Sequence, residues 1–149
     1  MSVTPDPKEE IRQLFRRHVP EISAGTVEIV SVARDVGRRS FIAVRSHLAE
    51  VDPVGACTGI RGARIKPMVD ELNREYLTVV RWEESAERFI RNALCPLPIS
   101  KVALDPQTRE ASVTIDGSRA TESTKVEQSN VRLASELTGW NIILGGVQE

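Results

Sequence analysis

The sequence has few of the residues that disulfide-bonded, metal-binding or membrane proteins need. Its 149 residues include two cysteines and two histidines, and only 4% are aromatic. Cys57 and Cys95 are far apart, and no Cys or His pair has the spacing of a metal site, which argues against a disulfide scaffold or a zinc motif. No apolar run approaches the ~18 residues of a membrane span, and the N-terminus lacks the features of a signal peptide. We expect a cytoplasmic protein with buried thiols and without metal, cofactor or membrane partner.

Charge is nearly balanced over the whole chain but unevenly distributed along it. The net charge is −1, yet residues 34–66 hold seven basic and three acidic side chains. Residues 67–149 hold nine basic and thirteen acidic side chains. Sixteen of the twenty cationic residues are arginine, which binds phosphate with two donors and stacks on bases. This usage is compatible with RNA contact, although charge alone fits a solvated mixed surface equally well.

The order of predicted elements is repeated in the two halves of the chain. Apolar spacing and capping signals predict helices at 7–18, 54–58, from 63 onward, after Ser85 and at 130–137. Alternating or β-rich runs predict strands at 27–33, 41–44, 76–82, 99–104, 110–115 and 140–144. The sequence therefore predicts two α/β units joined by a short helix.

A glycine motif, Gly59-Ile60-Arg61-Gly62, separates the helix predicted at 54–58 from the helix that begins at 63. Two glycines three apart are a weak signal and often mark only a corner between helices. Here the motif follows a β-hairpin, precedes a strand and contains a cation, which is the arrangement of a KH domain. Glycines let the backbone approach phosphates, the next helix offers N–H groups, and Arg64 and Lys66 add charge.

The stretch DPVGACTGIRGAR (52–64) resembles the first KH domain of the NusA family of transcription elongation factors. The resemblance continues through VPEI (19–22), GTVEI (25–29), the hairpin at 33–44, NAL (92–94), NVRLA (130–134) and LTGW (137–140). It covers nearly the whole chain. The fold that it implies is α+β, with two tandem type II (prokaryotic) KH domains. We assign residues 1–24 to a lead-in helix, 25–83 to the first domain, 84–98 to a connector helix and 99–149 to a degenerate second domain.

The resemblance also implies a function. Family members bind single-stranded RNA, the nascent transcript, during elongation, pausing, termination or antitermination, and RNA polymerase and other transcription factors are candidate partners. Carried over to this chain, the RNA-binding residues are Gly59, Ile60, Arg61, Gly62, Arg64 and Lys66. Bacterial members usually have a polymerase-binding domain and an OB-type domain before this region. The chain is therefore either a short stand-alone KH pair or a trimmed piece of a longer protein, and polymerase contact through that domain is not carried over.

The second KH unit departs from the family pattern. The family has a Gly-Lys-Gly-Gly loop where this chain has Lys125-Val126-Glu127-Gln128. Without glycine the backbone cannot come close to phosphate, and Glu127 would repel it. We therefore expect the second clamp to be abolished, while the alternative is a loop that binds in another way.

Other functions have less support in the sequence. A structural or protein-interaction module that kept the KH fold is the main alternative, favoured by the acidic second half. No catalytic pattern surrounds His18, His47 or Cys57, and the glycine loop lacks the Lys-Ser/Thr ending of a P-loop, so no enzyme is predicted. Trp82 and Trp140 are interpreted as core residues, and base stacking is not expected to be the main source of affinity.

Overall fold

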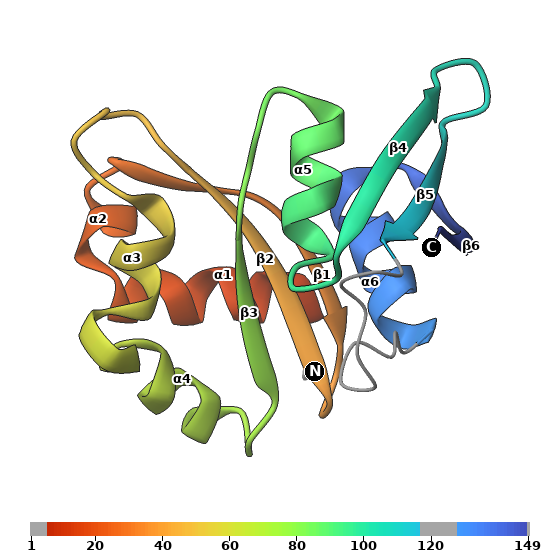
Figure 1. Cartoon of the computed structure of the whole chain (residues 1–149). Coiled ribbons are helices and arrows are strands. Elements are labelled where there is room, and N and C mark those ends of the chain that lie inside the picture. The colour runs from red at the N-terminus through yellow and green to blue at the C-terminus, as the bar shows by residue number, and fades with distance from the viewer. Residues whose placement is uncertain (1–5, 117–127, 149) are drawn as a thin grey trace. The chain divides into compact units, whose positions relative to one another are not determined.

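The chain folds into two units that follow one another in sequence. The computed structural model describes residues 6–116 and 128–148. The first unit spans residues 1–82 and the second spans residues 83–149. Each unit has a three-stranded sheet, with the order β1-β2-β3 in the first and β4-β5-β6 in the second (Figure 1). Within the described ranges, no helix is long and apolar enough to cross a bilayer.

The first helix, α1 (Pro7–His18), begins at the predicted capping signal. The Asp6 side chain accepts the N–H of Lys8 at 2.9 Å, and proline occupies the first helical position. Its apolar stripe is fully buried, and each such side chain contributes roughly 1.5–3 kcal/mol on burial. The stripe, which attaches α1 to the sheet, consists of Ile11, Leu14 and Phe15.

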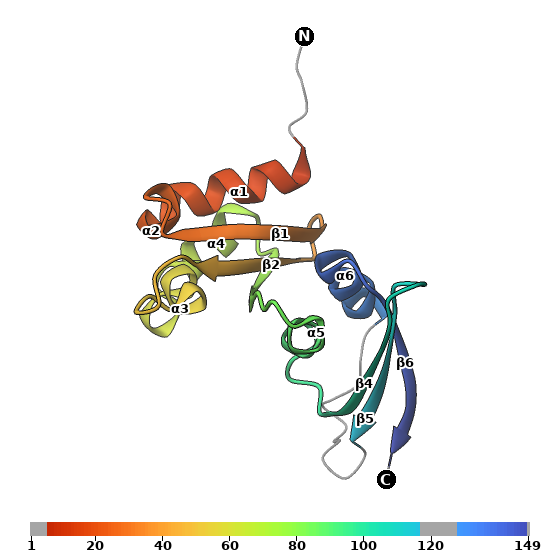
Figure 2. The same ribbon diagram turned by 90° about the horizontal axis from the view of Figure 1, so that it is seen from above.

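The first sheet combines a hairpin with a parallel strand. β1 (Val27–Asp35) and β2 (Arg39–Ser46) are antiparallel, and β3 (Tyr76–Arg81) pairs with β2 in parallel, with Tyr76 opposite Arg39. A parallel pair needs a crossover, which helices usually supply. Here α3 (Pro53–Thr58) and α4 (Ile65–Glu71) form it. Figure 2 shows α1 lying along β1 on the same unit.

One core holds the helices of the first unit on its sheet. It takes side chains from α1, β1, β2, α3 and α4. The packing therefore holds the helices on both sides of the glycine motif against the same sheet. A short helix that the sequence did not predict, α2 (Pro20–Ser23), follows Val19 and begins at a proline. Its partly buried Ile22 packs against that core. The main core residues are Ile11, Leu14, Phe15, Val19, Val27, Val32, Ile42, Val44, Cys57 and Met68.

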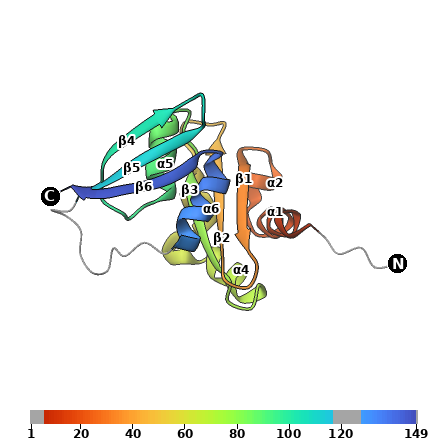
Figure 3. The same cartoon turned by 90° about the vertical axis from the view of Figure 1, so that its right-hand side faces the viewer.

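The second unit repeats the strand arrangement of the first. β4 (Ile99–Asp105) and β5 (Glu110–Asp116) are antiparallel, and β6 (Asn141–Gln148) is parallel to β5. Two helices, α5 (Ala86–Ala93) and α6 (Gln128–Thr138), pack together against this sheet (Figure 3). The buried side chains come from both helices and all three strands, and they include Phe89, Ile90, Val113, Leu133, Leu137 and Trp140.

The sequence predicted that both thiols and both tryptophans lie in the core. The prediction that both cysteines are buried holds for Cys57 in α3 but is wrong for Cys95, which is exposed. Cys95 lies in the turn beyond α5, past the last buried residue of the helix stripe. Trp140 is buried, with the guanidinium of Arg109 4.3 Å from its ring centre. Trp82 is half-buried beneath Arg45, at 5.2 Å.

Candidate nucleic-acid interface

The glycine motif forms a tight loop between α3 and α4. Gly59 has φ 74° and ψ 168°, a region of backbone space that is essentially restricted to glycine. A single short turn, η1 (Ile60–Gly62), follows, in which Arg61 has φ 56° and Gly62 has φ 77°. Three of the four motif residues therefore have positive φ, so the chain reverses direction within a few residues.

The two glycines are required for different reasons. A Cβ atom on Gly59 would lie 2.8 Å from the backbone nitrogen of Arg64, which is too close for any side chain. A Cβ atom on Gly62 would lie 3.3 Å from Cε of Lys66, which is the flexible end of a side chain. Gly59 therefore allows the loop to pack on the start of α4, whereas Gly62 mainly supplies the positive φ.

The tip of the loop presents an apolar and a cationic side chain to solvent. Ile60 is 85% exposed, the most exposed large apolar residue in the described ranges. Arg61 is also exposed, and its side chain makes no hydrogen bond or ion pair with any residue that the structure describes. An exposed guanidinium beside bare backbone can bind a phosphate, and an exposed aliphatic side chain can pack on a base.

Arg64 points into the protein. Its Nη1 donates to Oε1 of Glu21 at 2.8 Å and to the carbonyl oxygen of Ala56 at 2.7 Å, and the side chain is 36% exposed. The sequence predicted that Arg64 extends the cationic path along the RNA backbone. The structure shows in addition that it joins the loop to α2 and α3, with its charge balanced by Glu21.

The three backbone N–H groups that directly precede α4 are engaged within the protein. The N–H groups of Gly62 and Ala63 donate to the carbonyls of Gly59 and Ile60, and that of Arg64 donates to Thr58. These three groups are engaged in holding the turn. A ligand at the loop would therefore meet the cations of Arg61 and Lys66 rather than these three N–H groups.

A hollow continues from the loop along α4, and the sequence analysis missed it. It lies between α4 and β3, and Tyr76, at the start of β3, is 67% exposed at its rim. Lys66 belongs to both the loop surroundings and this hollow. The signal available in the sequence was the single tyrosine directly after the α4 region, at the first position of a strand. The hollow is lined by Ile65, Lys66, Val69, Asp70, Tyr76 and Leu77.

The second loop can be followed only in part. Lys125, Val126 and Glu127 lie outside the described residues, and Gln128 begins α6. The prediction that this clamp is abolished stays a prediction from sequence.

Cys57, His18 and His47, the residues weighed as catalytic candidates, are each buried among or paired with other residues of the protein. Burial raises the pKa of the Cys57 thiol to about 12, and the nearby charge of Glu21 acts in the same direction. His18 contacts Glu71, and His47 contacts Glu28 at 3.0 Å. Both contacts have the geometry of surface ion pairs. Among the residues that the structure describes, no three His, Cys, Asp or Glu side chains gather as a metal site would require.

Comparison with known proteins identifies both units. Residues 6–82 match the family model of the NusA-like first KH domain, and residues 86–148 match that of the NusA-like second KH domain. The transcription termination/antitermination protein NusA of Thermus thermophilus is 42% identical over 132 residues, which are 89% of this chain and 34% of that protein. NusA of Halalkalibacterium halodurans is 41% identical over 132 residues, covering 89% and 35% of the two chains.

A solved structure agrees on the fold. The crystal structure of APE1850 superposes with a TM-score of 0.62 at 18% identity, covering 95% of this chain and 97% of that one. The chain spans about a third of the length of the curated relatives it matches. The predicted fold class, α+β with two tandem KH domains, is confirmed. The chain belongs to the NusA-like KH family.

Proposed function

We propose that the chain binds single-stranded RNA through the Gly59–Gly62 loop of its first KH domain. The observation that carries the proposal is the loop geometry: two glycines with positive φ flank an exposed Ile60 and an Arg61 without a partner among the described residues. KH domains clamp about four nucleotides against such a loop. Arg61 and Lys66 supply cations for the backbone, and Arg64 holds the loop in place.

We infer the cellular process in which the RNA is bound from the names of the relatives. Three curated relatives are named transcription termination/antitermination proteins, and the chain matches part of each. The RNA would accordingly be a nascent transcript, bound during elongation, pausing, termination or antitermination. RNA polymerase and other transcription factors are the partners that such a role implies.

The test is a double substitution at the loop tip. Ile60→Asp with Arg61→Asp keeps both glycines but places two carboxylates where phosphate would bind. We expect binding of a short single-stranded RNA to be lost while the melting temperature changes little, because both side chains are exposed. Fluorescence anisotropy with a labelled RNA and a thermal melt measure the two effects.

The matched control makes the same charge change elsewhere. Leu48→Asp with Arg16→Asp alters an exposed aliphatic and an exposed arginine outside the loop. It should leave RNA affinity within about twofold, since only a weak long-range term is lost at physiological salt. Unaltered affinity in the loop variant would contradict the proposal and favour a protein-interaction module.

The affinity should depend only weakly on salt. One clamp and its neighbouring cations would neutralise about two to four phosphates, so the slope of log affinity against log salt should be roughly −1.5 to −3. A slope about twice as steep would show that the second unit also binds the strand.

A further inference from the structure

A recess lies between α1 and the outer strand of the first sheet, on a part of the unit that the RNA proposal does not use. It has a volume of about 300 Å³. β1 is at the edge of the sheet, and α1 lies along it (Figure 2). The residues that line the recess in the described chain all lie outside the glycine loop, α4, β3 and the hairpin turn. We name it the α1–β1 recess.

The floor of the recess is aliphatic and belongs to the core. Val27 and Ile29 on β1 are 1% and 9% exposed, and Ile22 on α2 packs against the same core. Because these side chains are packed from behind, the floor keeps its shape without a ligand. The lining residues in the described ranges include no aromatic ring, so the recess offers nothing on which a base could stack.

The rim of the recess carries two guanidinium groups. Arg12 and Arg16 are four residues apart on α1, so they share one face of the helix. Nη1 of Arg12 donates to the carbonyl oxygen of Ile29 at 3.2 Å. Neither guanidinium forms an ion pair with any residue that the structure describes. Both charges therefore remain available to a ligand.

The acidic side chain at the recess already has cationic partners. Among the described lining residues, the acidic one is Glu28. Its Oε1 accepts Nε of Arg45 and contacts Nε2 of His47, each at 3.0 Å. The charges of Arg12 and Arg16 are therefore in excess, and an acidic ligand would meet little opposing charge.

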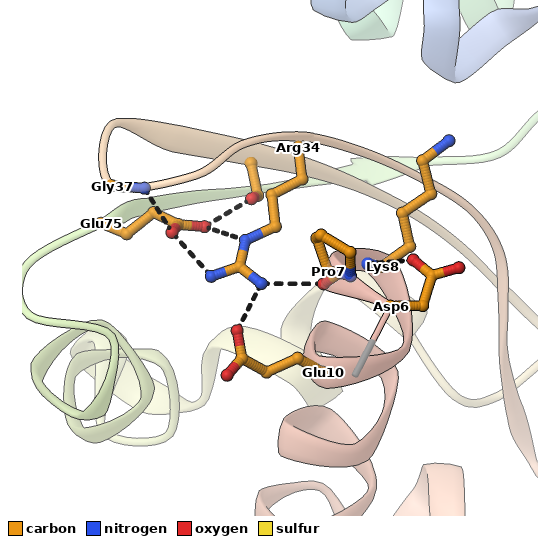
Figure 4. A network of polar contacts seen from close by, with 8 residues as sticks. Asp6, Pro7, Lys8, Glu10, Arg34, Gly37 and Glu75 are labelled. Carbon is orange, nitrogen blue, oxygen red and sulfur yellow. Dashed lines mark hydrogen bonds and ion pairs between the residues drawn. The ribbon is translucent and has the colours of Figure 1, made fainter. Parts of the chain in front are cut away.

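The first turn of α1 is anchored to the sheet by a buried arginine. Nη1 of Arg34 on β1 donates to the Pro7 carbonyl at 2.8 Å and pairs with Glu10 (Figure 4). Two further bonds of 2.9 Å join Arg34 to the carboxylate of Glu75. The side chains of Arg34 and Glu75 are 5% and 1% exposed, so this end of α1 is fixed to a buried network.

The last turn of α1 is anchored to α4. Arg17 and His18 both contact the carboxylate of Glu71 on α4. Arg12 and Arg16 lie between the two anchors, on a helix that is held at each end. A ligand would therefore find both guanidinium groups in place without first ordering α1, which lowers the entropic cost of binding.

An aliphatic floor with a cationic rim fits a protein segment better than a nucleic acid. Phosphates could pair with Arg12 and Arg16, but they would leave the floor exposed to water. A segment that carries aliphatic and carboxylate side chains covers the floor and pairs with the rim at once. Arg12 already binds the carbonyl of Ile29, so the segment is recognised by its side chains rather than by pairing as an added strand.

We propose that the α1–β1 recess is a docking site for an acidic segment of another protein, with an aliphatic side chain of that segment on the floor and its carboxylates on Arg12 and Arg16. Apolar contact at the centre with polar contact at the rim is the usual arrangement of a protein interface. The inference does not depend on RNA binding. It gives the first KH domain a second surface, for a different class of ligand.

The test uses the full chain and a labelled six-residue peptide with blocked ends, in which two leucines lie between pairs of glutamates. Binding should shift the backbone amide signals of Val27, Glu28 and His47 in an NMR titration and leave those of Gly59 and Gly62 unmoved. Two comparison peptides replace every glutamate with glutamine or every leucine with serine. Each should bind at least about fivefold more weakly, because each lacks one of the two kinds of contact.

The peptide comparison tests the two halves of the site separately. Equal affinity for the glutamine peptide would overturn the role of Arg12 and Arg16, and equal affinity for the serine peptide would overturn the role of the floor. Shifts confined to the glycine loop would overturn the location. So would the absence of any shift at a peptide concentration of about 1 mM, at which even a weak specific site is partly filled.

Substitution of the rim tests the same contacts from the side of the protein. Arg12→Ala with Arg16→Ala should weaken the acidic peptide about tenfold and leave the affinity for a short single-stranded RNA within about twofold. Arg16→Ala alone keeps the bond from Arg12 to Ile29, so it guards against a loss of folding. It should weaken the peptide about threefold. Anisotropy of the labelled peptide measures all three affinities.

The matched control is Arg61→Ala with Arg88→Ala, two exposed arginines that do not line the recess. It removes the same charge and should leave the peptide affinity within about twofold, while RNA affinity falls. An equal loss of peptide affinity in both double variants would show a general charge effect and overturn the inference. RNA affinity lost and peptide affinity kept in the Arg12/Arg16 variant would assign the recess to nucleic acid and also overturn it. Peptide binding without any RNA binding by the unaltered chain would support the docking site and contradict the loop proposal alone.

Discussion

Arg64 donates from one nitrogen to the carboxylate of Glu21, 2.8 Å away, and this bond joins the glycine loop to α2. α2 is the helix that the sequence did not predict, and Glu21 lies in it. One of the two cations predicted to add charge beside the loop is therefore already paired within the protein. Its effect on RNA should come through the shape of the loop.

Arg64 and Lys66 should respond differently to substitution. Lys66→Ala should weaken RNA binding and flatten the salt slope by about 0.7, the value for one phosphate on a single strand. Arg64→Ala should weaken binding with little change of slope, because Glu21 balances its charge. Arg64→Lys separates the two roles: it keeps the charge but replaces the guanidinium whose Nη1 reaches both Glu21 and the Ala56 carbonyl, so it should behave like the alanine variant. Full recovery with lysine would show that the charge of Arg64 acts on RNA directly.

The two motif glycines should differ in their tolerance of alanine. Gly59→Ala requires a glycine-only conformation and places Cβ 2.8 Å from a backbone nitrogen, so we expect a loss of about 3 kcal/mol in the free energy of unfolding. Gly62→Ala meets only the side chains of Lys66 and Ile65, none closer than 3.3 Å, and should cost about 1 kcal/mol. Urea unfolding measures both. Equal costs would mean that the contact with Arg64 relaxes freely.

Glu75 should make the first unit sensitive to acid. Burial by itself raises the pKa of Glu75, but hydrogen bonds from Arg34, Ser40 and the Gly37 N–H outweigh it, and the net shift of the pKa is downward. A carboxyl with a lowered pKa in the folded state stabilises the fold above its unfolded pKa, about 4.3, and loses that contribution as pH falls through the folded value.

Glu75→Gln measures this contribution. At pH 7 it should cost about 3 kcal/mol, because it leaves the buried Arg34 without a charged partner, and the difference from the unaltered chain should shrink below about pH 4. Unfolding free energies across that range provide the test, with exposed Glu84→Gln as the control. A difference that is constant with pH would rule out the carboxylate as the cause.

The two thiols should react at very different rates. Cys95 is exposed and should be modified by a thiol reagent in the folded protein, whereas Cys57 is buried with a pKa of about 12 and should react only on unfolding. Mass spectrometry with and without denaturant counts the modified sites. Labelling of Cys57 at the rate of Cys95 in the native chain would show that α3 opens readily.

Local signals were enough to predict most of the elements. Asp6-Pro7 and Asp52-Pro53 each cap a helix as expected, since capping depends on neighbours in sequence. The hairpin from Val27 to Ser46 and the repeat of its order in the second half also follow from local alternation and turn residues. The glycine loop was found for the same reason, because its unusual backbone requires glycine at fixed spacing.

Tertiary structure decided what each cation does. Nothing near Arg64 in the sequence shows that it meets Glu21, forty-three residues away, and nothing near Arg34 shows that it meets Glu75, forty-one residues away. The same holds for the exposure of Cys95 and for Tyr76 at the end of the hollow. By itself the sequence determined where helices, strands and the loop lie, because those preferences act between neighbours. Contacts between distant segments decide which charged side chains stay exposed to a ligand and which form ion pairs inside the fold. Only packing brings those segments together.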